Sequence, residues 1–331
     1  MKTGKLSFGW NLALLILPVV TALLCLGIGR MVVAPSQVLG ALFGGEVSDL
    51  VYKTVWNIRL PRIILAMLVG GGLAAAGCAF QSLFANPLAT PDTLGVASGA
   101  SFGAALAILM GFSMVGIQLT SLIAGGAAVL LTWLGGSKKG SGLNTIVLSG
   151  IMMGSLFNAL VSLVKYIADA EDQLPAITFW LMGGLNSAGW KNIALGAPAI
   201  VGSVVLLWLL RWRMNLLPLT EDEARASGVN MKALRGITIL CATLITASSV
   251  SMCGQVGWVG LLIPHICRMK FGSNHLSLLP ASVSLGATFM ILVDTLARSA
   301  TASEIPISIL TAIIGAPFFV VLMRRSGGWK L

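Results

Sequence analysis

Side chains that could carry out chemistry are few in this chain of 331 residues, of which only 10% are charged. No phosphate-binding loop of the G-x-x-x-x-G-K-[ST] type occurs, because "GGSKKGSG" (135–142) has its glycines and lysines in the wrong order. No H-E-x-x-H motif occurs either. The two histidines, His265 and His275, are separate, and a lone histidine in an apolar chain is typical of a structural role. We therefore expect no catalytic site, and predict that the chain is not an enzyme.

The five cysteines lie mostly in apolar segments and include no C-x-x-C pair. This pattern favours small buried apolar side chains over disulfides or metal ligands. We therefore expect no metal site. The cysteines are Cys25, Cys78, Cys241, Cys253 and Cys267.

One short stretch, "TEDEARASGVN" (220–230), is unusually polar for this chain. Thr220 and Glu223 have the spacing of a helix capping box, and Gly228 falls where a helix C-cap would lie. The stretch predicts a polar helix of about two turns with its own start and stop signals.

The composition indicates what surrounds these polar residues. The chain is 56% hydrophobic, and its charged fraction is far below the roughly 25% of soluble domains. A soluble fold could not cover its surface with so few charges, so the solvent must be mostly lipid. The net charge of +10 does not indicate nucleic-acid binding, because the basic residues lie in short segments between apolar runs, as orientation signals do.

Apolar stretches long enough for a bilayer span predict an all-α integral membrane protein. Lys2 and Lys5 precede the first stretch, which lacks a small-residue cleavage site and is read as an uncleaved helix rather than a signal peptide. The shorter "VGWVGLLIPHIC" (256–267) raises the number of spans from nine to ten. The other predicted spans are 11–33, 61–83, 93–112, 115–135, 143–167, 191–210, 233–253, 277–297 and 304–323.

Ten spans with both termini in the cytoplasm satisfy the positive-inside rule best. This topology places 14 of the 21 basic residues inside and the acidic "ADAEDQ" (168–173) outside. Nine spans would place the C-terminal "MRR" outside. The inner basic residues are Lys2, Lys5, Lys138, Lys139, Arg211, Arg213, Arg225, Lys232, Arg235, Arg268, Lys270, Arg324, Arg325 and Lys330.

Three arginines oppose this bias. Arg59 and Arg62 lie at the outer end of the second span, and Arg298 at the outer end of the ninth. They could be snorkelling anchors or pair locally, for instance Arg298 with Asp294 one turn away. They could equally form an outer surface that recognises carboxylates on a partner, a use to which arginine's planar fork is suited.

Glycines at helical spacing, Gly95, Gly99 and Gly103, indicate tight helix packing. "GGG" (70–72) marks either a close crossing or a flexible point. The spans hold almost no charge at mid-membrane, where ion-coupled carriers usually keep ionisable relays. With no nucleotide site either, the pattern favours transport driven by a separate subunit.

Several motifs resemble the permeases of ABC importers for iron-siderophore, haem and cobalamin uptake, the FecCD type of type II importers. The longest is "RLPRIILAMLVGGGLAAAGCAFQSLFANPLATPDTLGVASGA" (59–100). The others are "DQLPAITFWLMGGL" (172–185), "GWVGLLIPHICR" (257–268), "LLPASVSLGA" (278–287) and "EIPISILTAIIGAPFF" (304–319).

The resemblance implies one permease domain (1–331) of ten helices in a bacterial inner membrane, working as a homodimer or pseudo-dimer by alternating access. It implies two cytoplasmic ATPase subunits, which would use ATP and Mg, and an extracytoplasmic binding protein that delivers substrate. No cofactor would bind to this chain itself.

The resemblance also assigns roles to individual residues. Arg59, Arg62 and Arg298 would receive carboxylates of the binding protein. A cytoplasmic coupling helix (219–230) would contact the ATPase, and a cytoplasmic gate would lie after span two and at the start of span five. The coupling residues are Glu221, Asp222, Glu223, Ala224, Arg225 and Gly228, and the gate residues are Asn86, Leu88, Leu143 and Asn144.

The substrate is not legible from the motifs. An iron-siderophore complex or haem is expected first, with cobalamin or an oxyanion such as molybdate as alternatives within the family. From other classes, an ion-coupled secondary transporter or a membrane-embedded enzyme stay as alternatives. The first would need no ATPase, and the second would need clustered Asp, His or Arg at the membrane face.

Overall fold

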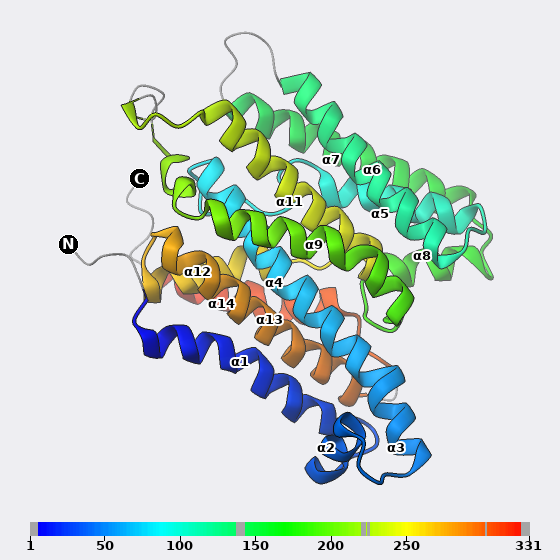
Figure 1. Ribbon diagram of the computed structural model, residues 1–331. Helices are drawn as coiled ribbons and strands as arrows, with labels where there is room; N and C mark the ends of the chain where they lie inside the picture. Colours follow the sequence, from blue (N-terminus) through cyan, green and yellow to red (C-terminus); the bar gives the residue numbers. More distant parts are fainter. Residues whose placement is uncertain (1–5, 137–142, 220–222, 224–225, 302, 326–331) are drawn as a thin grey trace.

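The computed structural model describes residues 6–136, 143–219, 223, 226–301 and 303–325, and in this part of the chain all regular secondary structure is helical (Figure 1). A helix matches each apolar stretch predicted from the sequence. These are α1 (Phe8–Gly27), α4 (Leu60–Leu83), α5 (Val96–Leu109), α6 (Met114–Gly136), α7 (Leu143–Ile167), α9 (Trp190–Leu210), α11 (Met231–Cys253), α12 (Val259–Phe271), α13 (His275–Ser299) and α14 (Ile307–Arg325).

Among the described residues, seven helices are long and apolar enough to cross a membrane, counting Asp49–Leu83 as one. Helices α5 and α12 have only 14 and 13 residues, and the apolar part of α14 is only Ile307–Val321. The 14 residues of α5 rise only about 21 Å, less than the roughly 30 Å of a bilayer core. The apolar pattern therefore located α5 correctly but overestimated its length.

Three short helices and two tighter or wider turns were not predicted, because none of them is long enough to show as a membrane span. The helices are α2 (Pro35–Phe43), α3 (Asp49–Lys53) and α8 (Gln173–Leu181). The turns are the π-helical η1 (Thr54–Arg59) and the 3₁₀-helical η2 (Arg213–Leu216).

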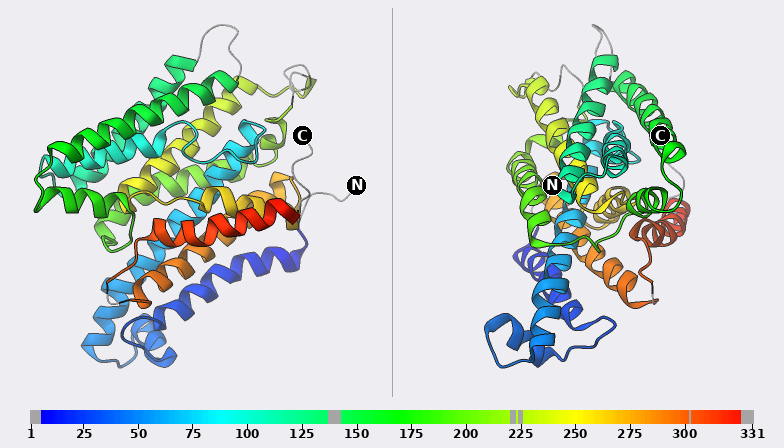
Figure 2. Two further views of the ribbon diagram at one scale, coloured as in Figure 1. Left: turned by 180° about the vertical axis from the view of Figure 1, so that it is seen from behind. Right: turned by 90° about the vertical axis from the view of Figure 1, so that its right-hand side faces the viewer.

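The bundle has a central layer and a periphery. The membrane-spanning parts of α4, α11 and α13 bury most of their residues, whereas those of α1, α6, α7 and α9 bury less than a third of theirs. Figure 2 shows α7 and α14 on the face turned away from the viewer in Figure 1. The main apolar core runs through the central helices, and two smaller apolar clusters lie around α5.

The "GGG" stretch lies within the continuous helix α4 at its crossing with α13. A Cβ atom added to Gly70 would lie 2.2 Å from the carbonyl oxygen of Gly286. Of the two interpretations left open by the sequence, the close crossing is therefore the correct one.

Helix α1 begins and α14 ends at the same end of the bundle, which we call the inner end (Figures 1 and 2). Helices α2 and α3 lie at the opposite end, which we call the outer end. Ends on the same side fit an even number of crossings. The count of ten and the cytoplasmic position of the termini stay predictions.

Candidate functional site

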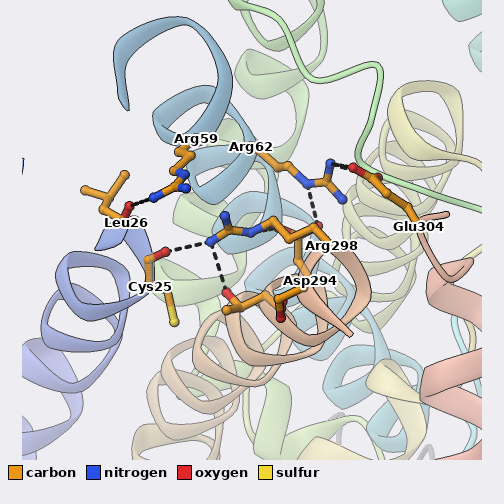
Figure 3. A network of polar contacts seen from close by, with 9 residues as sticks. Cys25, Leu26, Arg59, Arg62, Asp294, Arg298 and Glu304 are labelled. Carbon is orange, nitrogen blue, oxygen red and sulfur yellow. Dashed lines mark hydrogen bonds and ion pairs between the residues drawn. The ribbon is translucent and has the colours of Figure 1, made fainter. Parts of the chain in front are cut away.

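The three arginines predicted at the outer end lie in one cluster, which we call the arginine cluster (Figure 3). Arg59 is the last residue of η1, Arg62 lies in the first turn of α4, and Arg298 in the last turn of α13. Each side chain is less than a tenth exposed. The arginines therefore line a recess rather than spread over an open charged surface.

The π-helical turn that ends at Arg59 has a local cause. Pro61 has no N–H group and its ring crowds the preceding turn, so regular i→i−4 bonding is interrupted there. The N–H of Leu60 instead bonds the carbonyl of Val55, five residues earlier. This extra residue per turn sets the direction in which Arg59 leaves the helix.

Asp294 is the buried counter-charge of the arginine cluster. Its Oδ1 accepts a hydrogen bond from Nε of Arg62 at 2.7 Å, and its Oδ2 lies 3.6 Å from Nε of Arg298. The local pair with Arg298 is thus present, but the shorter contact is with Arg62, 232 residues away. Because breaking a buried ion pair leaves an uncompensated charge, Asp294 ties α4 to α13.

Glu304 is a second carboxylate in the arginine cluster that sequence reasoning missed. Its two oxygens lie 3.0 and 2.9 Å from Nη1 of Arg62, and its side chain is 30% exposed. A signal was available, since Glu304 is the acid that opens the "EIPIS" motif at the outer end of the last span.

The other guanidinium groups bind carbonyls at the C-terminal end of α1 and in the segment that follows it. Arg59 donates to the carbonyl of Leu26 at 2.6 Å and to that of Met31, and Arg298 donates to the carbonyl of Cys25 at 2.6 Å. Carbonyls at a helix C-terminus lack partners within the helix and carry partial negative charge, so they suit buried cations.

A pocket of about 320 Å³ lies against the arginine cluster. Exposed Arg30 stands at its rim, so four arginines and Glu304 give the lining a formal charge of +3. Arginine forks bind carboxylates and other anions in two-point contacts. The pocket can therefore receive an anionic group from outside. It is lined by Gly29, Arg30, Met31, Thr54, Ile58, Arg59, Arg62, Arg298 and Glu304.

At the inner end, Asn86 and Leu88 follow α4 and line a second pocket of about 410 Å³, the inner pocket. Ala85, just before them, has a left-handed φ of 46°, a strained conformation for alanine that turns the chain sharply out of α4. The wall opposite Asn86 and Leu88 is α7. Further lining residues include Thr90, Asp92, Thr93, Ser98, Gly154, Ser155 and Asn158.

The walls of the inner pocket contain several polar side chains, of which one, Asp92, is a carboxylate. Its Oδ1 accepts hydrogen bonds from the N–H groups of Ala97 and Ser98 at 2.8 and 3.3 Å. These are free donors of the first turn of α5, so Asp92 acts as a helix cap. Of the other gate candidates, Asn144 is exposed in the first turn of α7, and the side chain of Leu143 lies outside the described residues.

The predicted glycine row divides between two neighbours of α5. A Cβ atom on Gly99 or Gly103 would lie within 2.9 Å of a backbone carbonyl of α6. Gly95 is not within the helix but immediately precedes it, with φ +74°. A Cβ atom added to Gly95 would lie 3.1 Å from the backbone nitrogen of Gly154 in α7.

Most of the predicted coupling residues, Glu221, Asp222, Ala224 and Arg225, lie outside the described residues. Glu223 is exposed. Gly228 is also exposed and has φ +70°, the left-handed conformation that a glycine after a helix end adopts.

The histidines and cysteines have structural surroundings. Nδ1 of His275 lies 3.0 Å from Oδ1 of Asn215, and His265 packs edge-on against Phe319. All five cysteines are buried and free. Within the described residues, no three His, Cys, Asp or Glu side chains gather as a metal site would require.

Comparison with known proteins places these features in context. The model of the FecCD transport family matches residues 15–325. The molybdate import system permease protein MolB of Haemophilus influenzae is 43% identical over 97% of this chain and 96% of its own. The hemin transport system permease protein HmuU of Yersinia pestis is 34% identical over 94% of each chain. The Fe(3+) dicitrate transport system permease protein FecC of Escherichia coli is 35% identical over 99% of each.

Among solved structures, an ABC transporter assigned to the metal-chelate type, in an inward-facing conformation, has a TM-score of 0.88 at 41% identity. The match covers 96% of this chain and 99% of that one.

Proposed function

The chain belongs to the FecCD transport family and is a multi-pass membrane protein, and we propose that it is the permease subunit of an ATP-driven importer. The observation that carries the proposal is the family match over residues 15–325, nearly the whole chain. In the proposed assembly, two copies of the permease cross the membrane ten times each, with their termini in the cytoplasm. Two ATPase subunits hydrolyse ATP, and an extracytoplasmic binding protein delivers the cargo.

The arginine cluster is the proposed docking point for the binding protein. The pocket against it carries a formal lining charge of +3, and its arginines are held at fixed positions by α1, α13 and Asp294. A carboxylate on the partner would find several guanidinium donors already oriented. Preorganisation of this kind lowers the entropic cost of docking.

The inner pocket is part of the proposed cytoplasmic gate. Helix α7 lines it and leaves many of its other side chains exposed, which supports a place for α7 at the axis between two copies of the permease. The coupling segment (219–230) would transmit closure of the ATPases to this end of the bundle, with Gly228 as its stop signal.

A metal oxyanion such as molybdate is the first candidate for the cargo, and the 43% identity to a molybdate permease over almost both whole chains supports it. An iron chelate or haem, the expectation from the motifs, is the second candidate. It is supported by the relatives that carry hemin and ferric dicitrate and by the metal-chelate type of the solved structure.

Uptake of each candidate cargo from the medium into proteoliposomes would test both candidates. The permease is reconstituted with its ATPase and binding protein, and uptake of radioactive molybdate is compared with that of iron-siderophore complexes and haem. We expect ATP-dependent accumulation of molybdate and little of the others. Accumulation of an iron chelate alone would favour the second candidate, and accumulation of neither would contradict both.

A further inference from the structure

An apolar groove lies between α1 and α9, two helices on the face turned to the viewer in Figure 1, and the proposed transport function assigns it no role. Its volume is about 470 Å³. Helix α1 is held on α13 by a 2.5 Å hydrogen bond from Ser284 to the carbonyl of Leu14, while α9 packs on α4. The space between α1 and α9 is the groove. It is lined by Asn11, Leu14, Leu15, Pro18, Met67, Leu68, Val204, Val205, Trp208, Pro280, Val283, Ser284 and Ala287.

The groove runs from near the inner end to about the middle of the bundle, where Met67 and Leu68 of α4 line it. Its lining spans 11–18 on α1 and 280–287 on α13, each about 10 Å at 1.5 Å per residue. Half of a bilayer core is about 15 Å deep. Since α1 and α13 begin and α9 ends at the inner end, the groove has the depth and position of the lipid chains of that leaflet.

Two cation–aromatic pairs flank the inner mouth of the groove. The guanidinium of Arg211 lies 3.9 Å from the ring centroid of Trp208, which lines the groove, and donates to the carbonyl of Trp208 at 2.9 Å. Nζ of Lys270 lies 4.7 Å from the ring centroid of Trp10, next to Asn11 in the lining. Tryptophan is typical of the membrane–water interface, which places the two cations at the level of lipid headgroups.

The sequence around this mouth contains basic residues and no acidic ones. Neither 8–27 nor 190–216 nor 259–287 contains an Asp or Glu, whereas Arg213 adds a further exposed cation. The charge of the mouth is therefore complementary to a phosphate. The apolar wall beneath it is complementary to a hydrocarbon chain.

We propose that this groove is a binding site for an anionic phospholipid, with one acyl chain between α1 and α9 and the phosphate between Arg211 and Lys270. The site goes beyond the proposed transport function and rests on it only for the assignment of the inner end to the cytoplasmic leaflet. A neutral lipid or a helix of another protein would fit the apolar wall but would not use the two cations.

Native mass spectrometry of the purified permease–ATPase complex tests the proposal, with phosphatidylglycerol and phosphatidylcholine titrated into mixed micelles. We expect preferential retention of phosphatidylglycerol. Each of Arg211→Gln and Lys270→Gln should weaken it roughly fivefold, because a basic residue near anionic headgroups contributes about 1 kcal/mol. Lys191→Gln, at the exposed outer end of the same α9, should leave retention unchanged.

Filling the groove gives a second, independent arm. Val204→Phe should abolish retention of phosphatidylglycerol, while Leu206→Phe, at an exposed position on another face of α9 outside the lining, should not. An unchanged elution volume and melting temperature of the complex would verify that each variant folds. Equal retention of the two lipids, insensitivity to the two charge changes, or normal retention by Val204→Phe would each overturn the proposal.

Discussion

At the outer end of the bundle, Arg62 and Arg298 are buried against Asp294, and Arg59 is buried against the carbonyl end of α1. At the inner end, Lys270 is exposed and, like Arg211, lies over a tryptophan ring. The same residue types thus have opposite surroundings. The three arginines of the outer cluster are fixed by partners from distant parts of the chain, whereas Lys270 and Arg211 lie beside aromatic rings at the surface of the inner end.

This difference has a physical consequence for recognition. Burial of a charge costs free energy unless partners compensate it, so the arginine cluster must hold one geometry to exist at all. Exposed cations keep their hydration, so they carry little desolvation penalty. Their side chains also keep their rotamer freedom until a ligand orders them. The arginine cluster is therefore held in one geometry by its buried partners, whereas the exposed inner cations can reorient around a ligand.

The largest expected effect comes from removing the outer counter-charge. Asp294→Asn leaves Arg62 and Arg298 buried without their shared carboxylate, so the free energy of unfolding should fall by about 3–5 kcal/mol. Thermal unfolding of the purified protein in detergent measures this. Asp49→Asn is the control, because its partner Lys53 is exposed and the pair contributes less than about 1 kcal/mol. Equal melting temperatures for the two variants would show that the buried ion pair contributes no more to stability than the exposed pair.

Ala224→Pro tests the inner end at the proposed coupling segment, outside the described residues. Proline within a helix costs about 3 kcal/mol, so the predicted two-turn helix should not form and ATP hydrolysis should uncouple from uptake. Membrane insertion and melting temperature should stay as in the wild type, and Ala224→Ser should transport normally. Normal uptake by the proline variant would refute the coupling role.

A smaller effect is expected at the arginine cluster, the proposed docking point for the binding protein. Arg59→Gln should raise the Kd for the binding protein about tenfold, because it removes a charge oriented in the pocket. Surface plasmon resonance with the reconstituted permease measures it. Lys53→Gln, an exposed outer cation, should change the Kd little, and Arg59→Lys should recover part of the affinity. An unchanged Kd for Arg59→Gln would place docking elsewhere.

The smallest effect belongs to Gly228. Its φ of +70° disfavours any side chain, although a Cβ atom would meet open space, so Gly228→Ala should cost about 1 kcal/mol locally. Amide hydrogen exchange near 226–230 should accelerate about fivefold without a change in global melting temperature. Unchanged protection would mean that this segment is not held by its C-cap.

Much of the fold could be predicted because lipid imposes long apolar segments, and the boundaries of α4, α6, α7 and α9 lie within one residue of those expected. Short helices such as α2 and α3 carry no such signal. The three arginines could be assigned to the outer end because the positive-inside bias of the other basic residues sets the orientation of each span.

The partners of these arginines could be predicted only in part. Asp294 and Arg298 are four residues apart, about one helical turn, so helical periodicity predicts that they pair. Contact of Asp294 with Arg62, or of Arg62 with Glu304, depends on how α4 packs against α13 and on the path of the chain before α14. Side chains that interlock between helices and glycines that allow close contact determine this packing. The residue pattern within one segment does not show which other segment it will contact.

Uptake into proteoliposomes with a controlled energy source tests the central claim, that the chain is the permease of an ATP-driven importer. The permease is reconstituted with its ATPase and binding protein, and cargo uptake is measured with internal ATP, with ionophores that abolish proton and sodium gradients, and with gradients alone. We predict uptake that requires ATP and persists without gradients. Uptake that gradients sustain without ATP or the ATPase would contradict the proposed function and identify an ion-coupled carrier.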